Sequence, residues 1–240
     1  MSIAFEELDF RQTRIGDLSL RRRILPSLGV EVFEIKLGDE FLMSSLFTAG
    51  EIALAELGLR DFAGRPVDVV VGGLGLGYTA RAALDQPGVA SVLVVEAIPE
   101  VIEWHARGLL PLGPGLTGDK RLHLAQGDFF ALVNSPAQGL DPRTQGRRFD
   151  AILLDVDHSP RSVLHPSHAA FYEREGLRAL AVNLKPGGVF ALWSNEPPDD
   201  GFLKTLGSVF VASQAHVVTF PNPLQQREAS NTIYVAHTAA

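Results

Sequence analysis

The chain passes from strand to helix at Val69-Val70-Val71-Gly72-Gly73-Leu74-Gly75-Leu76-Gly77. An apolar, β-branched run ends in a cluster of glycines, and residues 78–84 that follow have a helix-forming composition. This order indicates a buried strand, a tight turn and a helix. Glycines permit positive φ and the close approach of a ligand to the backbone, and the free N–H groups at the start of the helix face that ligand. The stretch therefore predicts a ligand-binding turn.

A carboxylate follows at the end of the next apolar run. Glu96 closes Val92-Leu93-Val94-Val95 and stands roughly 20 residues beyond the glycines, where an acid can hold a ribose diol. Two charge-assisted hydrogen bonds would make that contact. The glycine turn and Glu96 together predict a site for a ribose-bearing nucleotide.

The glycine spacing selects among nucleotides. The third glycine of the dinucleotide fingerprint stands three residues after the second, and Tyr78 occupies that position here. The spacing Gly73-x-Gly75-x-Gly77 therefore weakens the pyrophosphate interpretation. A sulfonium nucleoside such as S-adenosylmethionine, which has no phosphate, fits better.

Composition limits the classes of protein that the chain can be. With 240 residues, 46% of them apolar and 20% charged, it can form one α/β domain, or a domain with a small appendage. No apolar run has membrane-spanning length and the start lacks the basic region of a secretory signal, so we expect a cytoplasmic protein without a membrane partner. The absence of cysteine excludes disulfides and thiolate metal sites, and a net charge of −7 argues against nucleic acid.

Polar residues collect where the predicted strands end. A small antiparallel β unit is expected over residues 10–41, and strands then alternate with helices, which implies a parallel sheet covered on both faces. We expect a helix up to residue 184, a turn at Lys185-Pro186-Gly187-Gly188 and a strand from Val189. Ligands on such sheets bind beyond the carboxyl ends of the strands. The glycine turn, Glu96, Asp128, residues 155–158 and residues 194–195 all fall at those ends.

These residues resemble the class I S-adenosylmethionine-dependent methyltransferase superfamily, and within it the spermidine synthase-like branch. The likeness rests on the glycine turn with Thr79-Ala80-Arg81, on residues 95–103, on Gly127-Asp128, on residues 149–155, and on Phe171-Tyr172 before residues 185–188. It implies an α/β fold with a doubly wound, mostly parallel seven-stranded, Rossmann-like sheet. A small N-terminal antiparallel β unit over residues 1–45 would precede a nucleoside-binding domain over residues 46–240.

The resemblance also implies roles for single residues. Glu96 would bind the ribose hydroxyls, Asp128 the adenine amine, and Asp155 would lie beside the reacting centre. Asp128 has a second interpretation, as the N-cap of the helix that begins at Phe129. The implied cofactor is S-adenosylmethionine or its decarboxylated form, and the family suggests a homodimer. The full set of cofactor-binding residues implied is Gly73, Gly75, Gly77, Glu96, Ala97, Asp128, Phe129 and Asp155.

The chain departs from the aminopropyltransferases of that branch at three amine-binding positions. Their acidic residue within the glycine turn is Leu76 here, and their Tyr-His pair before the sheet aligns with Ala49 and Gly50. Their second aspartate after the fourth strand aligns with His158, and Asp157 is displaced by one position. An unmodified polyamine site is therefore not expected.

Transfer from a sulfonium requires an aligned nucleophile and, for an amine or hydroxyl, removal of a proton. We expect Asp155 to hold a cationic amine or to stabilise charge near the sulfonium. His158 is a candidate general base or substrate ligand, because imidazole exchanges protons near neutral pH, with Asp157 or Asp155 orienting its ring. The alternative is that His158 begins a turn and contacts only water. No metal site is expected.

Three functions stay open on the sequence. The favoured one is methyl transfer to a small-molecule acceptor, because the nucleoside site is intact and the amine-binding residues are changed. The second is aminopropyl transfer from decarboxylated S-adenosylmethionine to a polyamine. The third is nucleoside binding without catalysis.

Overall fold

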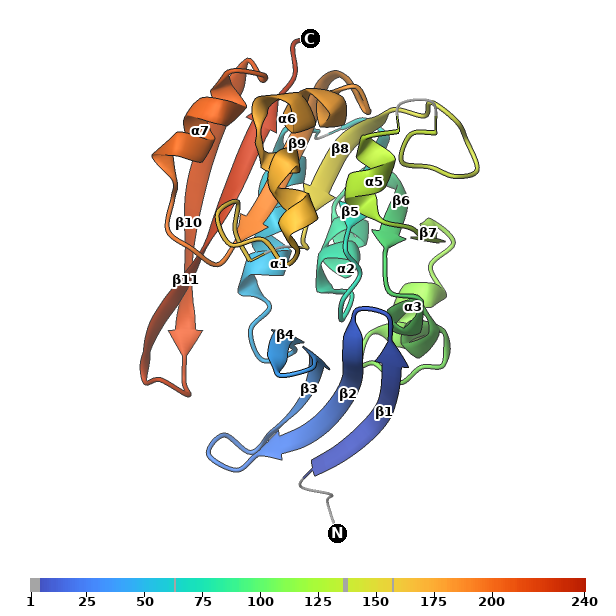
Figure 1. Cartoon of the computed structure of the whole chain (residues 1–240), viewed down its shortest axis with the longest axis vertical. Helices are drawn as coiled ribbons and strands as arrows, with labels where there is room; N and C mark the ends of the chain where they lie inside the picture. The colour runs from blue at the N-terminus through green and yellow to red at the C-terminus, as the bar shows by residue number, and fades with distance from the viewer. Residues whose placement is uncertain (1–4, 63, 136–137, 157) are drawn as a thin grey trace.

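A computed structural model of the chain describes residues 5–62, 64–135, 138–156 and 158–240. Two sheets form the molecule, and the small N-terminal sheet lies below the large sheet in the view of Figure 1. Among the described residues, no helix is both long and apolar enough to span a bilayer.

The N-terminal sheet is antiparallel and has four strands in the order β1-β2-β3-β4. Its inner side chains, among them Leu18, Leu20 and Ile35, are buried and belong to the same core as one face of the large sheet. The small β unit expected from the sequence is thus confirmed. The division after residue 45 stays a prediction. The strands are β1 (Phe5–Thr13), β2 (Gly16–Leu25), β3 (Val30–Leu37) and β4 (Glu40–Ser44).

The large sheet has seven strands in the order β10-β11-β9-β8-β5-β6-β7. The strands from β5 to β9 pair in parallel. The C-terminal hairpin joins the sheet through β11, which is antiparallel to both β9 and β10. This is the predicted doubly wound, mostly parallel class I methyltransferase sheet. The strands are β5 (Val67–Gly72), β6 (Val89–Glu96), β7 (Leu122–Gln126), β8 (Phe149–Leu154), β9 (Leu184–Ser194), β10 (Ala212–Asn222) and β11 (Arg227–His237).

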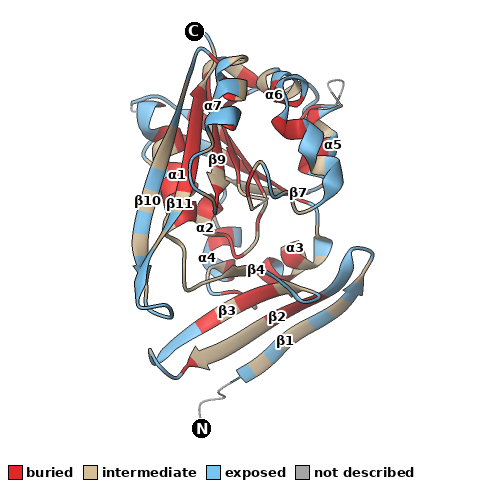
Figure 2. Cartoon of the chain, turned by 60° about the vertical axis from the view of Figure 1, so that its left-hand side comes forward, coloured by how far each residue is buried: buried red, intermediate tan, exposed pale blue. Residues whose placement is uncertain are grey.

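Helices cover both faces of the large sheet because successive side chains of its strands point to opposite faces. Val69 and Val71 join one core cluster and Val70 joins the other. Helices α1 to α4 contribute to the first cluster and α5 to α7 to the second, with the buried sides drawn in red in Figure 2. The helices are α1 (Ala49–Leu59), α2 (Tyr78–Asp85), α3 (Pro99–Ala106), α4 (Gly113–Thr117), α5 (Phe129–Val133), α6 (Arg174–Ala181) and α7 (Asp200–Gly207), with 3-10 turns η1 (Arg60–Phe62) and η2 (Pro166–Tyr172).

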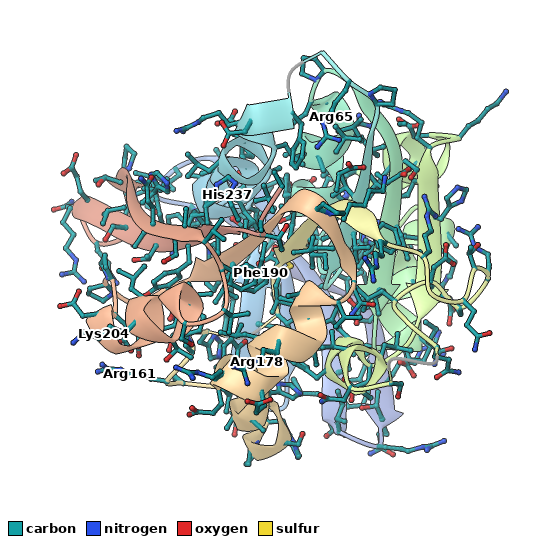
Figure 3. All side chains as sticks on the ribbon, turned by 90° about the horizontal axis from the view of Figure 1, so that it is seen from above. Arg65, Arg161, Arg178, Phe190, Lys204 and His237 are labelled. Carbon is teal, nitrogen blue, oxygen red and sulfur yellow. The ribbon has the colours of Figure 1, made fainter. Side chains whose placement is uncertain are left out.

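The view from above separates the core from the surface. Phe190 of β9 lies near the centre with no exposed area, whereas Arg161, Arg178 and Lys204 lie toward the outside (Figure 3). These three cationic side chains remain in water while the aromatic ring is removed from it, as expected for a chain that buries a full core.

One boundary predicted from the sequence is wrong. Helix α6 ends at Ala181, and β9 begins at Leu184, so the expected turn at residues 185–188 is part of a strand. Leu184 pairs with Phe149 in the parallel ladder, and the N–H of Gly187 donates to the carbonyl of Ala239 at 2.7 Å. These partners are far away in sequence, and they override the local turn preference of proline and glycine.

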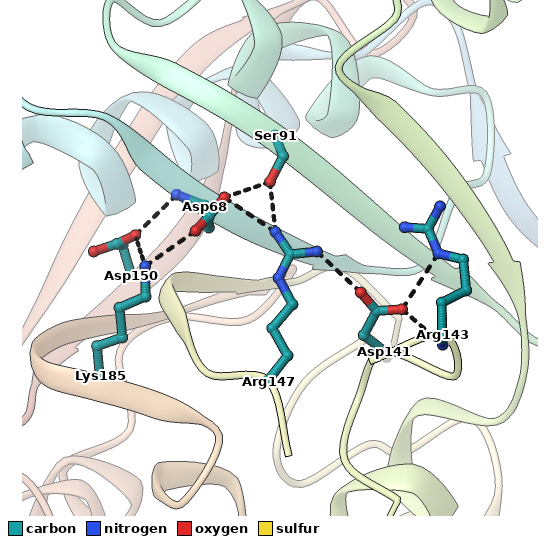
Figure 4. A network of polar contacts seen from close by, with 7 residues as sticks. All are labelled: Asp68, Ser91, Asp141, Arg143, Arg147, Asp150 and Lys185. Carbon is teal, nitrogen blue, oxygen red and sulfur yellow. Dashed lines mark hydrogen bonds and ion pairs between the residues drawn. The ribbon is translucent and has the colours of Figure 1, made fainter. Parts of the chain in front are cut away.

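The amino ends of the strands are joined by a network of charged groups (Figure 4). Lys185 donates to Asp150 at 2.7 Å and to Asp68 at 3.1 Å, and Arg147 bridges Asp68 and Asp141. Asp150 is 1% exposed, so its charge needs these partners. The network ties the amino edge of the sheet together and leaves the opposite, carboxyl edge for a ligand.

Candidate functional site

The turn after β5 has the glycine-dependent geometry that the sequence predicts. Gly73, Gly75 and Gly77 have φ values of 92°, 47° and 93°, a region that side chains disfavour. A Cβ atom on Gly73 would lie 2.2 Å from the carbonyl oxygen of Asp155, so the turn packs directly on the segment that follows β8. The turn and the end of β8 therefore form one surface.

Glu96 anchors this turn from the neighbouring strand. Its Oε2 accepts from the N–H of Leu74 at 2.8 Å, and its Oε1 accepts from the N–H of Ile98 at 2.7 Å. Burial raises the pKa of this carboxyl. The structure thus brings together the acid and the glycines that the sequence paired. The contact of Glu96 with a ribose stays a prediction, and the observed role is to fix the shape of the turn.

Asp128 caps α5, as its second interpretation suggests. Oδ1 accepts from the N–H of Phe130 at 2.9 Å and of Ala131 at 3.2 Å, which leaves Oδ2 for a ligand. The side chain of Phe129 is 3% exposed and belongs to the second core, so only its backbone can face a nucleoside. Ala97, next to Glu96, is exposed at the same edge.

Asp155 lies beside a second carboxyl that sequence reasoning missed. Its Oδ2 accepts from the hydroxyl of Thr79 at 2.6 Å, and burial raises its pKa to about 6. Glu51, in the first turn of α1, is 8% exposed; burial and then the charge of Asp155 raise its pKa to about 8. Two such carboxyls do not both ionise near neutral pH without a cation beside them. This pair can share a proton or hold a cation.

No pattern in the sequence pointed to Glu51 as a site residue. An acid in the first turn of a helix is common, because it interacts favourably with the helix dipole. The side chain is buried because α1 packs on one face of the sheet and its first turn lies at the carboxyl edge, next to Tyr78. The Tyr78 hydroxyl hydrogen-bonds to Ser45, and burial raises its pKa, with a smaller contribution from the charge of Glu51.

The His158 ring has Glu40 as its partner among the described residues. Its Nε2 lies 2.9 Å from Oε1 of Glu40 in β4, while the hydroxyl partner of Asp155 is Thr79. The other proposed orienting residue, Asp157, lies outside the described residues. The carbonyl of His158 also accepts from the N–H of Asn195 at 2.8 Å, which fixes the loop after β8 to the end of β9.

The altered amine-binding positions have structural explanations. A Cβ atom on Gly50 would lie 2.3 Å from Nε1 of Trp193 and 2.6 Å from Oδ1 of Asn231, so the indole occupies the space of a side chain. Leu76 has no exposed area and packs in the first core cluster. Neither position can present a charged group to a ligand in this packing.

Strand β4 covers the carboxyl edge from the N-terminal sheet. Met43 Sδ accepts from the N–H of Leu76 at 2.9 Å, Glu40 contacts His158, and Ser45 just beyond the strand contacts Tyr78. Figure 1 shows β4, the last strand of the N-terminal sheet, on the side of that sheet toward α1 and α2. The candidate site therefore has walls from both sheets.

Comparison with curated proteins finds polyamine aminopropyltransferases. The enzyme of Mycobacterium tuberculosis (strain ATCC 25618 / H37Rv) is 28% identical over 160 residues, which cover 63% of this chain and 29% of that protein. Polyamine aminopropyltransferase 2 of Pseudomonas aeruginosa is 28% identical over 167 residues, which cover 65% and 43%. The chain thus spans less than half the length of these curated relatives. No protein-family model matches it.

Solved structures show the same fold. Spermidine synthase from Thermotoga maritima superposes with a TM-score of 0.73 at 19% identity, covering 97% of this chain and 73% of that one. Human methyltransferase-like protein 13 in complex with SAH gives 0.54 at 25% identity, covering 79% of each chain. The chain thus has the class I S-adenosylmethionine-dependent methyltransferase fold, and in sequence it is similar to the spermidine synthase-like branch of that superfamily.

Proposed function

We propose that the chain is a transferase that uses a sulfonium nucleoside of the S-adenosylmethionine type, and that it moves an aminopropyl group from the decarboxylated nucleoside to an amine. The observation that carries this proposal is the pair formed by the buried Glu51 and the partly buried Asp155 beside the glycine turn. The names of the curated relatives support the same reaction. A solved spermidine synthase of the same fold, with a TM-score of 0.73 at 18% identity, is in complex with the transition state analogue AdoDATO.

The residues present fit such a nucleoside. Glu96 holds the turn rigid, so that the backbone from Gly73 to Gly77 can approach the nucleoside. Asp128 keeps Oδ2 available for an exocyclic amine, because both of its backbone bonds use Oδ1. The neighbouring carboxyls of Glu51 and Asp155 would offset the positive charge of a sulfonium or ammonium group.

The chemistry that the nucleoside supplies when bound is a carbon activated by a positively charged sulfur. In the transfer, the nitrogen lone pair of the acceptor forms the new bond to that carbon, the electron pair of the broken carbon–sulfur bond stays on sulfur, and the nitrogen loses one proton. Glu51 in its ionised form is suited to take this proton, since a pKa of about 8 makes its carboxylate a stronger base than that of an ordinary glutamate. Asp155, fixed by Thr79, would align the amine.

In this proposal His158 lies at the edge of the acceptor site. Its partner Glu40 belongs to β4, so the ring joins the covering strand to the loop after β8. In our proposal it closes the acceptor side, and the proton goes to the carboxyl pair instead.

Methyl transfer is the second candidate. It is favoured by Leu76 and Gly50, which supply no charge at two amine-binding positions of the family pattern. The sequence alone favours this reaction, whereas the relatives support aminopropyl transfer better. The two reactions differ in whether the donor carries a carboxylate.

Product analysis separates these candidates. The purified protein is incubated with a diamine and either donor, and mass spectrometry detects methylthioadenosine after aminopropyl transfer or S-adenosylhomocysteine after methyl transfer. Glu51→Gln should lower the rate at least tenfold, while Glu56→Gln, exposed on the same helix, should not. S-adenosylhomocysteine alone would replace our proposal by methyl transfer. Binding of either nucleoside without turnover would support the non-catalytic hypothesis, and absence of binding would reject all three.

A further inference from the structure

The peptide between Gly75 and Leu76 is held from two sides. His105 Nε2 lies 2.9 Å from the carbonyl oxygen of Gly75, and the N–H of Leu76 donates to Met43 Sδ at 2.9 Å. The C=O and N–H groups of one trans peptide point in opposite directions. A hydrogen bond from His105 on the carbonyl side therefore turns the Leu76 N–H toward β4 and the carboxyl edge of the sheet.

The protonation state of His105 follows from this contact. A carbonyl oxygen only accepts, so Nε2 must carry the proton and Nδ1 must be bare. His105 has no exposed area, and burial lowers its pKa, which keeps the ring neutral. Within the described part of the chain, the buried Nδ1 has no hydrogen-bond partner.

An unpaired buried nitrogen costs free energy, and an apolar ring of similar size would avoid that cost. The space itself does not require histidine, since a Cβ atom on Gly77 would lie 2.9 Å from a carbon of the ring and 2.6 Å from the apolar side chain of Leu116. The imidazole adds one hydrogen bond, from its Nε2 to the carbonyl oxygen of Gly75. Its specific contribution is therefore the orientation of the turn.

Met43 Sδ, the acceptor of the Leu76 N–H, is a weak hydrogen-bond acceptor. A thioether sulfur accepts hydrogen bonds poorly compared with an oxygen. Met43 is partly exposed and belongs to β4, the strand that covers the site. An oxygen atom of a ligand can therefore replace the sulfur at the Leu76 N–H with a gain in hydrogen-bond strength.

We propose that His105 is a positioning residue: it orients the Gly75–Leu76 peptide so that the Leu76 N–H is presented to an oxygen of the bound nucleoside, a place that Met43 Sδ holds in the free protein. This inference rests on the proposed nucleoside-binding function. It assigns His105 no contact with substrate, because the ring lies behind the turn.

A pair of amide variants tests the role of the ring. In His105→Gln the side-chain nitrogen can reach the place of Nε2, whereas in His105→Asn the shorter side chain brings its nitrogen near the place of Nδ1. We expect crystal structures to show the Gly75–Leu76 peptide unchanged in the Gln variant and rotated in the Asn variant. Calorimetry with methylthioadenosine and S-adenosylhomocysteine should give affinities within about twofold of wild type for Gln and about tenfold weaker for Asn.

The outcomes distinguish this inference from the proposed function. An unrotated peptide in the Asn variant would overturn the inference whether or not nucleosides bind. Equal weakening in both variants, with equal loss of thermal stability, would overturn it by showing a purely structural role. If wild-type protein binds neither nucleoside, the proposed function fails and the inference fails with it, because the Leu76 N–H then has no nucleoside oxygen to bind. His123→Asn, on the partly buried strand β7, serves as the control for a histidine remote from the turn.

Discussion

Replacing Glu51 by glutamine should make the free protein more stable at alkaline pH. Glutamine keeps the shape of the side chain and removes its charge. In the native protein, burial and the charge of Asp155 raise the pKa of Glu51 from 4.5 to about 8. Between these values the native state binds more protons than the unfolded state, so stability falls as pH rises.

The structure sets the size of this effect. Each pKa unit corresponds to 1.36 kcal/mol, so a shift from 4.5 to about 8 allows a loss of about 3 to 5 kcal/mol by pH 8.5. Below pH 4.5 Glu51 is protonated in both states and the loss is absent. The glutamine variant has no group that titrates at this position. We therefore expect a difference of less than about 1 kcal/mol between the two proteins at pH 5 and an advantage for the variant of a few kcal/mol at pH 8.5.

Urea denaturation at pH 5, 6.5 and 8.5, followed by circular dichroism, measures the difference. Glu56→Gln, on the exposed side of α1, should change stability by less than about 0.5 kcal/mol at each pH. A diamine added at pH 8.5 should stabilise wild type more than the Glu51 variant, because the cation compensates the ionised pair. A glutamine variant that is less stable than wild type at pH 8.5, or shifted equally at all three pH values, would refute the assignment of Glu51 as a buried, uncompensated acid.

Further predictions concern the turn, the covering strand and the opposite edge of the sheet. Gly73→Ala should lower the free energy of unfolding, measured by urea denaturation, by about 2 to 4 kcal/mol, because the new methyl group adds a clash with the Asp155 carbonyl to the strain of a positive φ. Gly64→Ala, with φ 90° and open space around it, should lower it by about 1 kcal/mol. Equal costs would contradict the close approach to β8. Met43→Leu should tighten nucleoside binding several-fold in calorimetry, because the turn N–H loses its protein acceptor; weaker binding would show that the sulfur assists the ligand. Lys185→Met should destabilise the protein by about 1 to 3 kcal/mol, because the buried Asp150 loses one cationic partner and keeps Arg65. Nucleoside affinity should not change, and a change in affinity would connect this network to the site.

The sequence determined the elements and the edge at which the site forms. The run of valines before Gly73 can only be a buried strand, and the glycines and Glu96 mark the end of two neighbouring strands. These features depend on residues close together in the chain. The spacing of apolar residues and glycines therefore predicted the sheet, its small N-terminal companion and the turn that Glu96 holds.

The tertiary structure decided which side chains meet. The charges of Glu51 and Asp155 interact because α1 packs on one face of a sheet whose fourth parallel strand lies about 100 residues further along the chain. Glu40 reaches His158 from the other sheet, and His105 reaches Gly75 from α3. A local pattern holds no information on such contacts, because each depends on the packing of two elements distant in sequence. The fold could thus be predicted from the sequence, whereas the Glu51–Asp155 pair and the orientation of the Gly75–Leu76 peptide became evident only in the tertiary structure.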